Sequence, residues 1–280
     1  MQRIGVLYNP LSAESLDLSG RIAAWLEARG LEVWRGISQE GREHPGLVAG
    51  LDLLIALGGD GTVLRAARLA IPCGVPVLPV ALGRLNFMAE LTPADVFDGL
   101  TVLLDGGGWR DERALLEATV LCAGQPPRRA LALNEALVAR GDINRVVVVD
   151  VEIYHALLTT YHADGVIVAT ATGSTAYALS AGGPLVDPRS RALTLVPVAA
   201  HLTNIPSLVL HEDAEVTLRL RSRHPAAFSA DGREAITLHA GDVVEVRRAA
   251  AVCTFARVHA PQWFYEQLPQ RLRREVGGVK

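Results

Sequence analysis

The chain has 280 residues, half of them apolar, and a formal net charge of −3 at pH 7. This length is sufficient for about two domains with a sizeable core. Only one of the 27 basic residues is a lysine, Lys280, which is the last residue. The chain before it therefore excludes mechanisms built on a P-loop lysine, a Schiff-base lysine or a protein-kinase lysine. Any phosphate group has to be held by arginine, backbone N–H groups or a metal ion.

The remaining composition is typical of a cytoplasmic protein. The three cysteines are far apart and lack CxxC spacing, which argues against a disulfide framework and a zinc site. Residues 1–7 enter a strand-like segment without the apolar region and cleavage site of a signal peptide. No apolar run approaches ~18 residues, so we expect no membrane span. The slight acidity argues against nucleic-acid binding.

The first part of the chain alternates strand and helix patterns. Apolar runs typical of buried strands occupy residues 4–8, 31–34, 51–57 and 76–80. Helical spacing follows Ser12 and occupies residues 63–70, and Thr92 with Pro93 predicts the start of another helix. This alternation predicts an open, mostly parallel sheet in an α/β, Rossmann-like domain over residues 1–110.

After three consecutive glycines at 106–108 the pattern becomes β-rich. Short apolar runs separated by turn residues occupy 118–121, 130–139, 146–153, 165–169, 193–196, 216–220 and 243–246. They predict a β-rich, sandwich-like C-terminal domain over residues 111–258. The amphipathic segment 259–280 is expected to pack back on the first domain.

A glycine-rich turn joins the predicted strand 51–57 to the helix after it. Glycines allow close approach of a phosphate to the backbone, and a helix N-terminus favours negative charge. The turn residues are therefore candidate phosphate ligands: Gly58, Gly59, Asp60, Gly61 and Thr62. The Asp60 carboxylate could accept a proton from a hydroxyl nucleophile or bind magnesium. A tight turn with a solvated aspartate is the alternative. Arg65 on the following helix favours the phosphate interpretation.

Two further clusters carry polar groups. Residues 164–184 run from a strand into a turn that is rich in glycine and hydroxyl groups. The candidate contacts for a base or a ribose in this turn are Thr172, Thr175, Tyr177 and Ser180. The alternative for the hydroxyl groups is that they cap a helix. Asn134 and Glu135 lie inside the predicted strand 130–139, where polar side chains are costly unless paired. Their donor and acceptor groups suit the hydroxyls of a sugar, although chance surface placement is the alternative.

These clusters, in this order, resemble the NAD kinase family. The family pattern combines a GGDGT turn, an Asn-Asp/Glu pair and a long DG…TPTGSTAYxLSAGGP run. The chain matches it from residues 8–10 through 183–184 to 229–232. The resemblance implies transfer of the γ-phosphoryl group of ATP, or of polyphosphate, to the adenosine-ribose 2′-hydroxyl of NAD. It also implies Mg²⁺ or another divalent ion and self-association into dimers or tetramers.

The resemblance also implies roles for particular residues. Asp60 would be the general base, and Gly61 would allow close approach of the substrate. Asn134 and Glu135 would hold the adenosine ribose or the adenine edge, and Asp164 would bind the nicotinamide amide, from a neighbouring subunit in some arrangements. The adenine and ribose pocket would be lined by Thr175, Ala176, Tyr177 and Ser180, with Phe87 and Ala199 as further walls. The candidates for phosphate or ribose contacts are Arg65, Arg145, Arg233 and His162; the sequence assigns no metal ligand.

Four positions depart from the family pattern. Ala171 replaces a proline, Ala81 replaces an asparagine, Asn86 replaces a glycine and His162 stands where arginine or lysine is frequent. These changes bear on affinity and nucleotide preference more than on the reaction.

Two other functions remain open at this stage. Lipid and sphingoid kinases share the GGDGT turn, but they would normally lack the TGSTAY run and would need an apolar acceptor pocket. The loss of the asparagine at position 81 and of the proline at position 171 allows a non-catalytic nucleotide-binding homologue. Retention of Asp60, Asn134, Glu135 and Asp164 argues against it.

Overall fold

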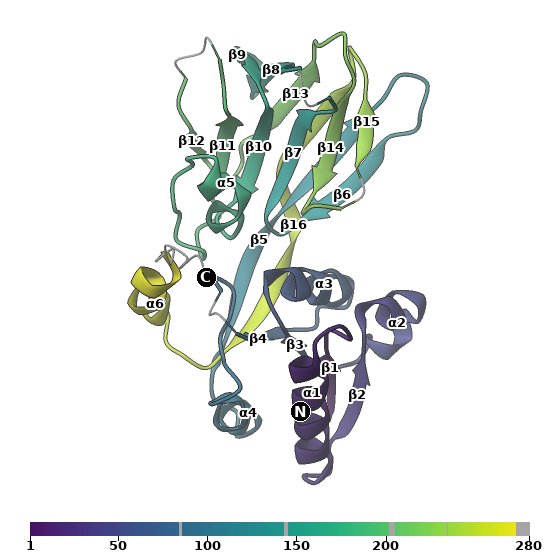
Figure 1. The fold of residues 1–280 in the computed structure, drawn as a ribbon, viewed down its shortest axis with the longest axis vertical. Helices are drawn as coiled ribbons and strands as arrows, with labels where there is room; N and C mark the ends of the chain where they lie inside the picture. Colours follow the sequence, from purple (N-terminus) through teal and green to yellow (C-terminus); the bar gives the residue numbers. More distant parts are fainter. Residues whose placement is uncertain (84–85, 143–144, 202–204, 234, 273–280) are drawn as a thin grey trace, which may run out of the picture. The chain divides into compact units, whose positions relative to one another are not determined.

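The computed structural model describes residues 1–83, 86–142, 145–201, 205–233 and 235–272. Lys280 therefore lies outside the described residues. By its internal contacts the chain divides into two compact units. The first unit combines residues 1–112 with 253–280, and the second contains residues 113–252. Two long strands, β5 (Trp109–Leu121) and β16 (Val243–Arg257), contribute residues to both units (Figure 1).

The first unit is an α/β unit with a parallel sheet. Its strands follow the order β2-β1-β3-β4, and Phe255 near the end of β16 pairs in parallel with Val77 of β4. The strands are β1 (Arg3–Leu7), β2 (Glu32–Gly36), β3 (Leu53–Leu57) and β4 (Val77–Val80). The helices are α1 (Ala13–Glu27), α2 (Ser38–Glu43), α3 (Asp60–Ala70), α4 (Val96–Leu104) and α6 (Trp263–Leu272), with short 3₁₀ turns at Pro45–Leu47 and Ile71–Cys73.

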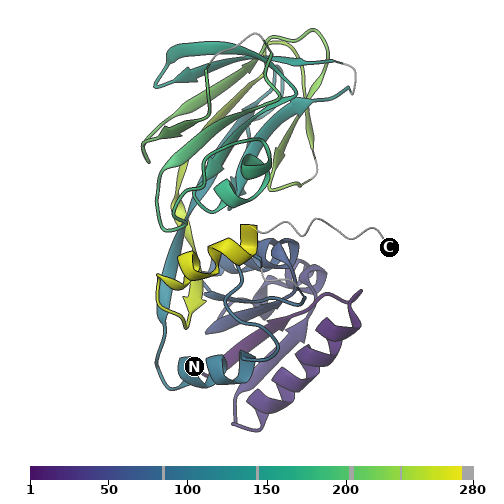
Figure 2. The same cartoon turned by 60° about the vertical axis from the view of Figure 1, so that its left-hand side comes forward.

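The sequence explains this unit's core. Every residue of β3 is fully buried, as expected for a central parallel strand covered on both faces. Helix α1 begins after Ser12, whose side chain accepts the Ser15 N–H, and its apolar residues Ile22 and Leu26 are buried against the sheet. Figure 2 shows α1 running along the parallel strands of this unit.

One predicted helix start in this unit is wrong. Thr92 was expected to cap a helix with Pro93 at its first position, but α4 begins at Val96. The Asp95 carboxylate instead accepts hydrogen bonds from the N–H and the hydroxyl of Thr92. These bonds close a separate turn before the helix.

The second unit is an antiparallel β-sandwich. One sheet contains β16, β13, β8 and β9 in that order, with β5 paired to β16 and to β6; the other follows β12-β11-β10-β7-β14-β15. The remaining bounds are β6 (Arg128–Ala132), β7 (Glu135–Arg140), β8 (Val147–Ile153), β9 (Ala156–Ala163), β10 (Gly165–Thr170), β11 (Leu193–Val198), β12 (Leu208–Leu210), β13 (Val216–Leu220), β14 (Ala226–Ala230), β15 (Ile236–Leu238), the 3₁₀ turn Gly173–Thr175 and α5 (Tyr177–Ser180).

The two sheets of this unit share one apolar core. Val149 and Tyr161 from the first sheet pack in the same cluster as Val168 and Phe228 from the second. The predicted fold class, an α/β unit with a mostly parallel sheet and a β-rich second unit, is therefore confirmed. Among the described residues, no helix has the length and apolar character needed to cross a membrane.

Candidate functional site

The glycine-rich turn lies where strand β3 passes into helix α3. Gly58 has a φ of +151°, and a Cβ atom there would lie 2.6 Å from the Thr62 hydroxyl oxygen, so this position requires glycine. Gly59 caps the helix, and its carbonyl accepts the N–H of Thr62 at 2.8 Å. The turn thus exposes the N-terminus of an 11-residue helix at the carboxyl edge of a parallel sheet, where open α/β folds bind ligands.

Asp60 is the first residue of α3, and burial dominates its electrostatics. Burial raises the pKa of its carboxyl, while the Met88 N–H and the positive charge of Arg271 lower it, and the net shift is upward. Its Oδ1 atom is buried and has no hydrogen-bond partner. A buried oxygen of this kind is available to accept a proton from a hydroxyl group. The geometry therefore suits Asp60 to the predicted role of general base.

Two other predicted residues, Arg65 and Phe87, also lie in the first unit. Arg65, one turn along α3, donates from Nη2 to the Thr62 hydroxyl at 2.9 Å while its side chain remains exposed. Phe87 is partly buried, and its carbonyl oxygen accepts a hydrogen bond from Arg271. An exposed guanidinium beside a helix N-terminus is suited to bind phosphate.

Asn134 and Glu135 lie in the second unit, and one expectation about them is wrong. Residues 130–139 do not form a single strand, because β6 ends at Ala132 and β7 begins at Glu135. The Asp231 carboxylate accepts the N–H groups of Leu133, Asn134 and Glu135 at 2.8 to 3.1 Å. These bonds replace ladder bonds and bend the chain at Asn134.

The Asn134–Glu135 pair contains buried polar atoms without a protein partner. Burial, assisted by the negative charge of Asp231, raises the pKa of Glu135 to about 7. Asn134 Oδ1 and Glu135 Oε2 are buried without a hydrogen bond. Because a buried acceptor left unpaired costs about 1–3 kcal/mol, these atoms favour a ligand that brings donors, such as sugar hydroxyls.

The hydroxyl-rich turn after β10 packs directly on this pair. The Thr170 N–H donates to the Asn134 carbonyl oxygen at 2.9 Å, and the Thr170 hydroxyl donates to the Leu133 carbonyl at 2.6 Å. Gly173 sits against the Asn134 backbone so closely that a Cβ atom would lie 2.0 Å from the Asn134 oxygen. This turn is therefore locked to Asn134, and the chain continues from it through the predicted residues Thr172, Thr175, Ala176, Tyr177 and Ser180.

The side chains of this turn divide into buried and exposed groups. The Thr172 hydroxyl is buried and accepts a hydrogen bond from Arg113 at 3.3 Å. Thr175 donates its hydroxyl to the Thr172 carbonyl at 2.9 Å. Tyr177 is 43% exposed, and Ser180 is also exposed. The exposed ring and hydroxyl are available to a ligand, whereas the two threonine hydroxyls also hold the turn.

Asp164 and His162 belong to a neighbouring part of the second unit. Asp164 forms an ion pair with Arg140 at 3.0 Å, a partner that sequence reasoning missed. The backbone of His162 bridges to His201, whose N–H donates to the His162 carbonyl at 2.7 Å. Ala199, also in this unit, is exposed and has a φ of +46°.

Two predicted arginines, Arg145 and Arg233, are exposed. Among the described residues, neither side chain forms a hydrogen bond or an ion pair with another predicted site residue. Sequence reasoning also missed Asp231, which accepts the backbone N–H groups of residues 133–135, and Met88 and Arg271, which lower the pKa of Asp60. Only Asp231 carried a sequence signal, since it lies in an Asp-Gly turn within the family pattern.

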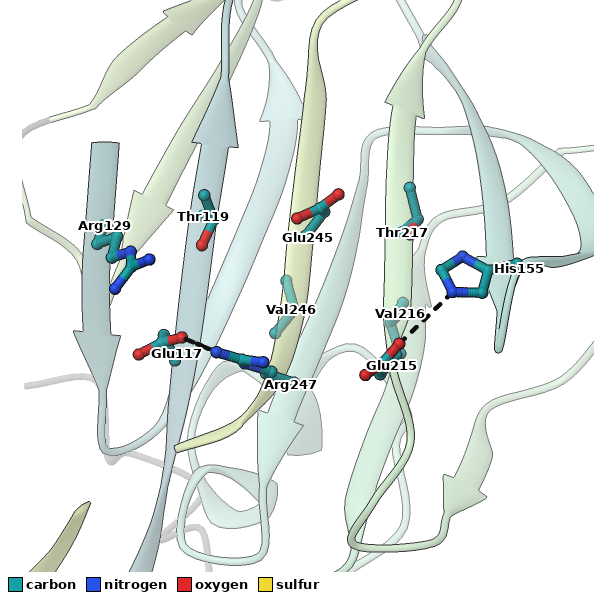
Figure 3. A pocket seen from close by; sticks show the side chains of 10 residues that line it. All are labelled: Glu117, Thr119, Arg129, His155, Glu215, Val216, Thr217, Glu245, Val246 and Arg247. Atoms are coloured by element: carbon teal, nitrogen blue, oxygen red, sulfur yellow. Dashed lines mark hydrogen bonds and ion pairs between the residues drawn. The ribbon is translucent and has the colours of Figure 1, made fainter. Parts of the chain in front are cut away.

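A hollow of about 270 Å³ lies elsewhere, on a sheet face of the second unit (Figure 3). Glu117 forms an ion pair with Arg247 there at 2.7 Å, and the His155 ring lies 3.7 Å from the Glu215 carboxylate. None of the predicted site residues lines it; the lining residues are Glu117, Thr119, Arg129, His155, Glu215, Val216, Thr217, Glu245, Val246 and Arg247.

A glycine turn with a buried carboxylate in the first unit, and a buried pair suited to sugar hydroxyls in the second, are features expected of a phosphotransferase with an alcohol acceptor. Residues 40–108 match the family described as the ATP-NAD kinase N-terminal domain, and residues 133–258 match the ATP-NAD kinase C-terminal domain. The chain belongs to the NAD kinase family, as its sequence motifs predict.

Named relatives agree with this assignment. The NAD kinase of Chloroflexus aurantiacus is 61% identical over 274 residues, which cover 98% of this chain and 99% of that protein. The NAD kinase of Dehalococcoides mccartyi is 39% identical over 273 residues, covering 97% and 96%.

Two solved structures share the fold. The yeast NADH kinase complexed with NADH matches with a TM-score of 0.81 and 21% identity, covering 99% of this chain and 90% of that one. An NAD kinase from Archaeoglobus fulgidus in complex with ATP matches with a TM-score of 0.79 and 22% identity, covering 96% and 98%.

Proposed function

We propose that this chain is an NAD kinase that transfers the γ-phosphoryl group of ATP to the 2′-hydroxyl of the adenosine ribose of NAD. The products are NADP and ADP. Membership of the family and the 61% identity to a protein named NAD kinase support this activity. The structural observation that carries the chemistry is the buried, unpaired Oδ1 of Asp60 beside a glycine-rich helix N-terminus.

In the proposed reaction, Asp60 accepts the proton of the 2′-hydroxyl. The hydroxyl oxygen then forms a bond to the γ-phosphorus, and the bond from that phosphorus to the β-phosphate oxygen breaks, so that ADP leaves with the electron pair. The glycine turn and Arg65 would bind phosphate oxygens. In-line phosphoryl transfer depends on positioning and charge stabilisation rather than on a lysine. The scarcity of lysine in the chain is therefore compatible with this activity.

The second unit would bind the nucleoside part of NAD. The unpaired atoms of Asn134 and Glu135 would accept hydrogen bonds from the adenosine ribose, and the exposed Tyr177 ring would stack on a base. Asp164 would hold the nicotinamide amide. Ala176 and Ser180 would supply further surface on the same turn, and the buried Thr172 would hold the turn in place.

We also propose that Mg²⁺ takes part, because it would neutralise phosphate charge when bound. The described residues contain no cluster of three or more His, Cys, Asp or Glu side chains that could hold a metal. The nucleotide phosphates and water would therefore supply most of the oxygen ligands of the ion, as is usual for Mg²⁺.

Self-association, a cytoplasmic location and use of polyphosphate as an alternative donor also belong to this proposal. The exposed apolar side chains of Tyr154 and Leu157, at the hairpin that joins β8 to the edge strand β9, provide a surface for self-association. Sedimentation of the purified chain would measure the association directly.

The activity is tested by incubating the purified chain with NAD, ATP and Mg²⁺ and measuring NADP; parallel reactions replace ATP with polyphosphate. Asp60→Asn should lower kcat about 10²–10⁴-fold with little change in the KM for NAD, as expected for loss of a general base. Asp17→Asn, at an exposed position on α1, is the matched control and should retain wild-type rates. If no NADP forms with either donor, the proposal is refuted. That result would favour a lipid kinase or a non-catalytic nucleotide-binding protein instead.

A further inference from the structure

Asp164, the expected ligand of the nicotinamide amide, is held by its backbone within the second unit. It lies between β9 and β10, and its N–H donates to the carbonyl of Val198, the last residue of β11, at 2.9 Å. Its own carbonyl accepts the N–H of Arg140, the last residue of β7, at 3.0 Å. Because β7 and β11 are the two neighbours of β10 (Figure 1), the main chain at Asp164 is fixed from both sides.

Arg140 also binds Asp164 through its side chain. Its Nη1 atom forms the ion pair with Asp164 Oδ1 at 3.0 Å. In the antiparallel ladder of β7 and β10, Ala139 pairs with Gly165, so Arg140 and Asp164 stand opposite each other one step further along. Side chains that stand opposite each other in a ladder lie close together, so the strand register itself brings this pair together.

The Arg140–Asp164 pair lies at the edge of the sandwich core. Side chains alternate between the two faces of a strand, so the pair shares a face with Val138 and Val166, which are buried in the core between the sheets. The side chains of Arg140 and Asp164 are 35% and 31% exposed. Both charged groups are therefore partly enclosed by protein and still accessible to a ligand.

The pair presents hydrogen-bond donors beside an acceptor. A guanidinium carries five N–H donors, and a carboxylate carries two acceptor oxygens. Within the described part of the second unit, the Arg140 guanidinium is paired with Asp164 Oδ1 alone, and Asp164 Oδ2 has no partner. A primary carboxamide is complementary to this arrangement, because its N–H₂ group donates and its carbonyl oxygen accepts. Asp164 by itself could satisfy only the N–H₂ half of such a group.

We propose that Arg140 is a second ligand of the nicotinamide carboxamide, which donates to its carbonyl oxygen while Asp164 accepts from its N–H₂ group. This assignment rests on the proposed function, which brings the nicotinamide amide to Asp164. The positive charge of Arg140 also compensates that of Asp164, so that a neutral amide meets a pair without net charge. The two residues together select a carboxamide over a group that offers only one half of its hydrogen-bonding pattern.

The test compares NAD with an analogue that keeps one of the two contacts. In 3-acetylpyridine adenine dinucleotide a methyl group replaces the amide nitrogen, so the carbonyl oxygen remains and the N–H₂ donor is lost. The dissociation constants of both dinucleotides are measured by titration calorimetry for the wild type, Arg140→Met and Asp164→Asn. Arg247→Met is the matched control, because Arg247 also pairs with a carboxylate in the second unit but lines a hollow that contains none of the predicted site residues.

Arg140→Met should raise the dissociation constants of NAD and of the analogue by the same factor, about 5–20-fold, since both dinucleotides keep the carbonyl that Arg140 binds. Asp164→Asn should raise the constant of NAD by a similar factor but that of the analogue by about twofold or less, because the methyl group has no bond to lose. The kcat at saturating NAD should stay within about twofold of wild type in both variants, since phosphoryl transfer takes place at the other nucleoside. Arg247→Met should change none of these quantities.

A rise in Arg140→Met that is confined to NAD would overturn the inference, because it would show that Arg140 acts only by orienting Asp164. Unchanged constants for both dinucleotides would overturn it as well. Each variant is first checked for cooperative unfolding. If Arg140→Met does not fold, Arg140→Lys carries the test: it keeps the charge but not the planar fork, and it should raise both constants equally, by about 2–5-fold.

Failure of the inference differs from failure of the proposed function. A wild type that shows this binding pattern without forming NADP would refute the kinase activity alone. A wild type that forms NADP, while Arg140→Met binds both dinucleotides as tightly, would refute the inference alone. A wild type that binds neither dinucleotide would refute both.

Discussion

Substitution of Gly173 by alanine tests how closely the hydroxyl-rich turn is locked to Asn134, which is proposed to bind the ribose. A Cβ atom at this position would lie 2.0 Å from the Asn134 carbonyl oxygen and 2.7 Å from its Cα. Contacts below 3.0 Å essentially do not occur for real Cβ atoms. The obstacle is backbone rather than a flexible side chain, so the turn and Asn134 have to separate by about 1 Å.

That separation has two consequences of calculable size. It strains the Thr170 N–H bond to the Asn134 carbonyl, which is 2.9 Å long in the native fold. Overpacking costs about 1–3 kcal/mol and a lost backbone hydrogen bond about 1 kcal/mol, so we expect a total destabilisation of about 2–4 kcal/mol. A displacement of about 1 Å in a substrate-positioning group lowers kcat/KM about 10²-fold.

The measurements are urea unfolding and NADP formation as a function of NAD concentration. Gly20→Ala in helix α1 is the control, because a Cβ atom there meets nothing within 4 Å and alanine favours a helix by about 0.5–1 kcal/mol. A Gly173→Ala protein with wild-type unfolding midpoint and wild-type kcat/KM would show that Asn134 and the turn are not mechanically coupled, and the reasoning would be wrong.

Three further outcomes follow from the buried charges. Glu135→Gln should stabilise the fold by about 1–3 kcal/mol at pH 8 and leave its stability unchanged at pH 4.5. The reason is that the folded-state pKa of Glu135, about 7, lies above the ordinary 4.5, so the wild-type protein loses stability as the pH rises between these two values. Equal urea midpoints of the variant and the wild type at pH 8 would contradict this. Arg257→Leu should cost about 3–5 kcal/mol, since Glu90 and Asp111 lose their buried partner; a thermal melt within two degrees of wild type would exclude it. Asp231→Asn should cost about 1–3 kcal/mol and raise the KM for NAD, because its amide replaces an oxygen that accepts backbone N–H groups; a variant with unchanged KM would contradict the ribose-binding role.

The glycine turn could be predicted from sequence because its determinants are local. A continuous apolar run identifies the buried strand β3, and Gly58 and Asp60 follow it directly at the start of α3. The long strand β16 was only partly predicted. Its exposed polar residues, such as Glu245 and Arg247, interrupt the apolar pattern although the backbone continues to Arg257.

The polar environment of the site could not be predicted in this way. The Met88 N–H and the charge of Arg271 lower the pKa of Asp60 from distant parts of the chain, and no spacing rule connects them to the glycine turn. The break at Asn134 has the same origin, because it depends on the Asp231 carboxylate about a hundred residues later. Residue type and local pattern predict candidate groups, whereas hydrogen bonds between distant segments determine their protonation and their orientation.

The return of the chain to the first unit also sets an order for its folding during synthesis. The second unit is continuous from residue 113 to 252, so it can complete its sandwich as soon as that stretch has left the ribosome. The first unit has to wait for Phe255 to pair with β4 and for α6 to bind the segment 87–89. A nascent chain released before residue 253 would therefore carry the complete glycine turn in an unfinished first unit.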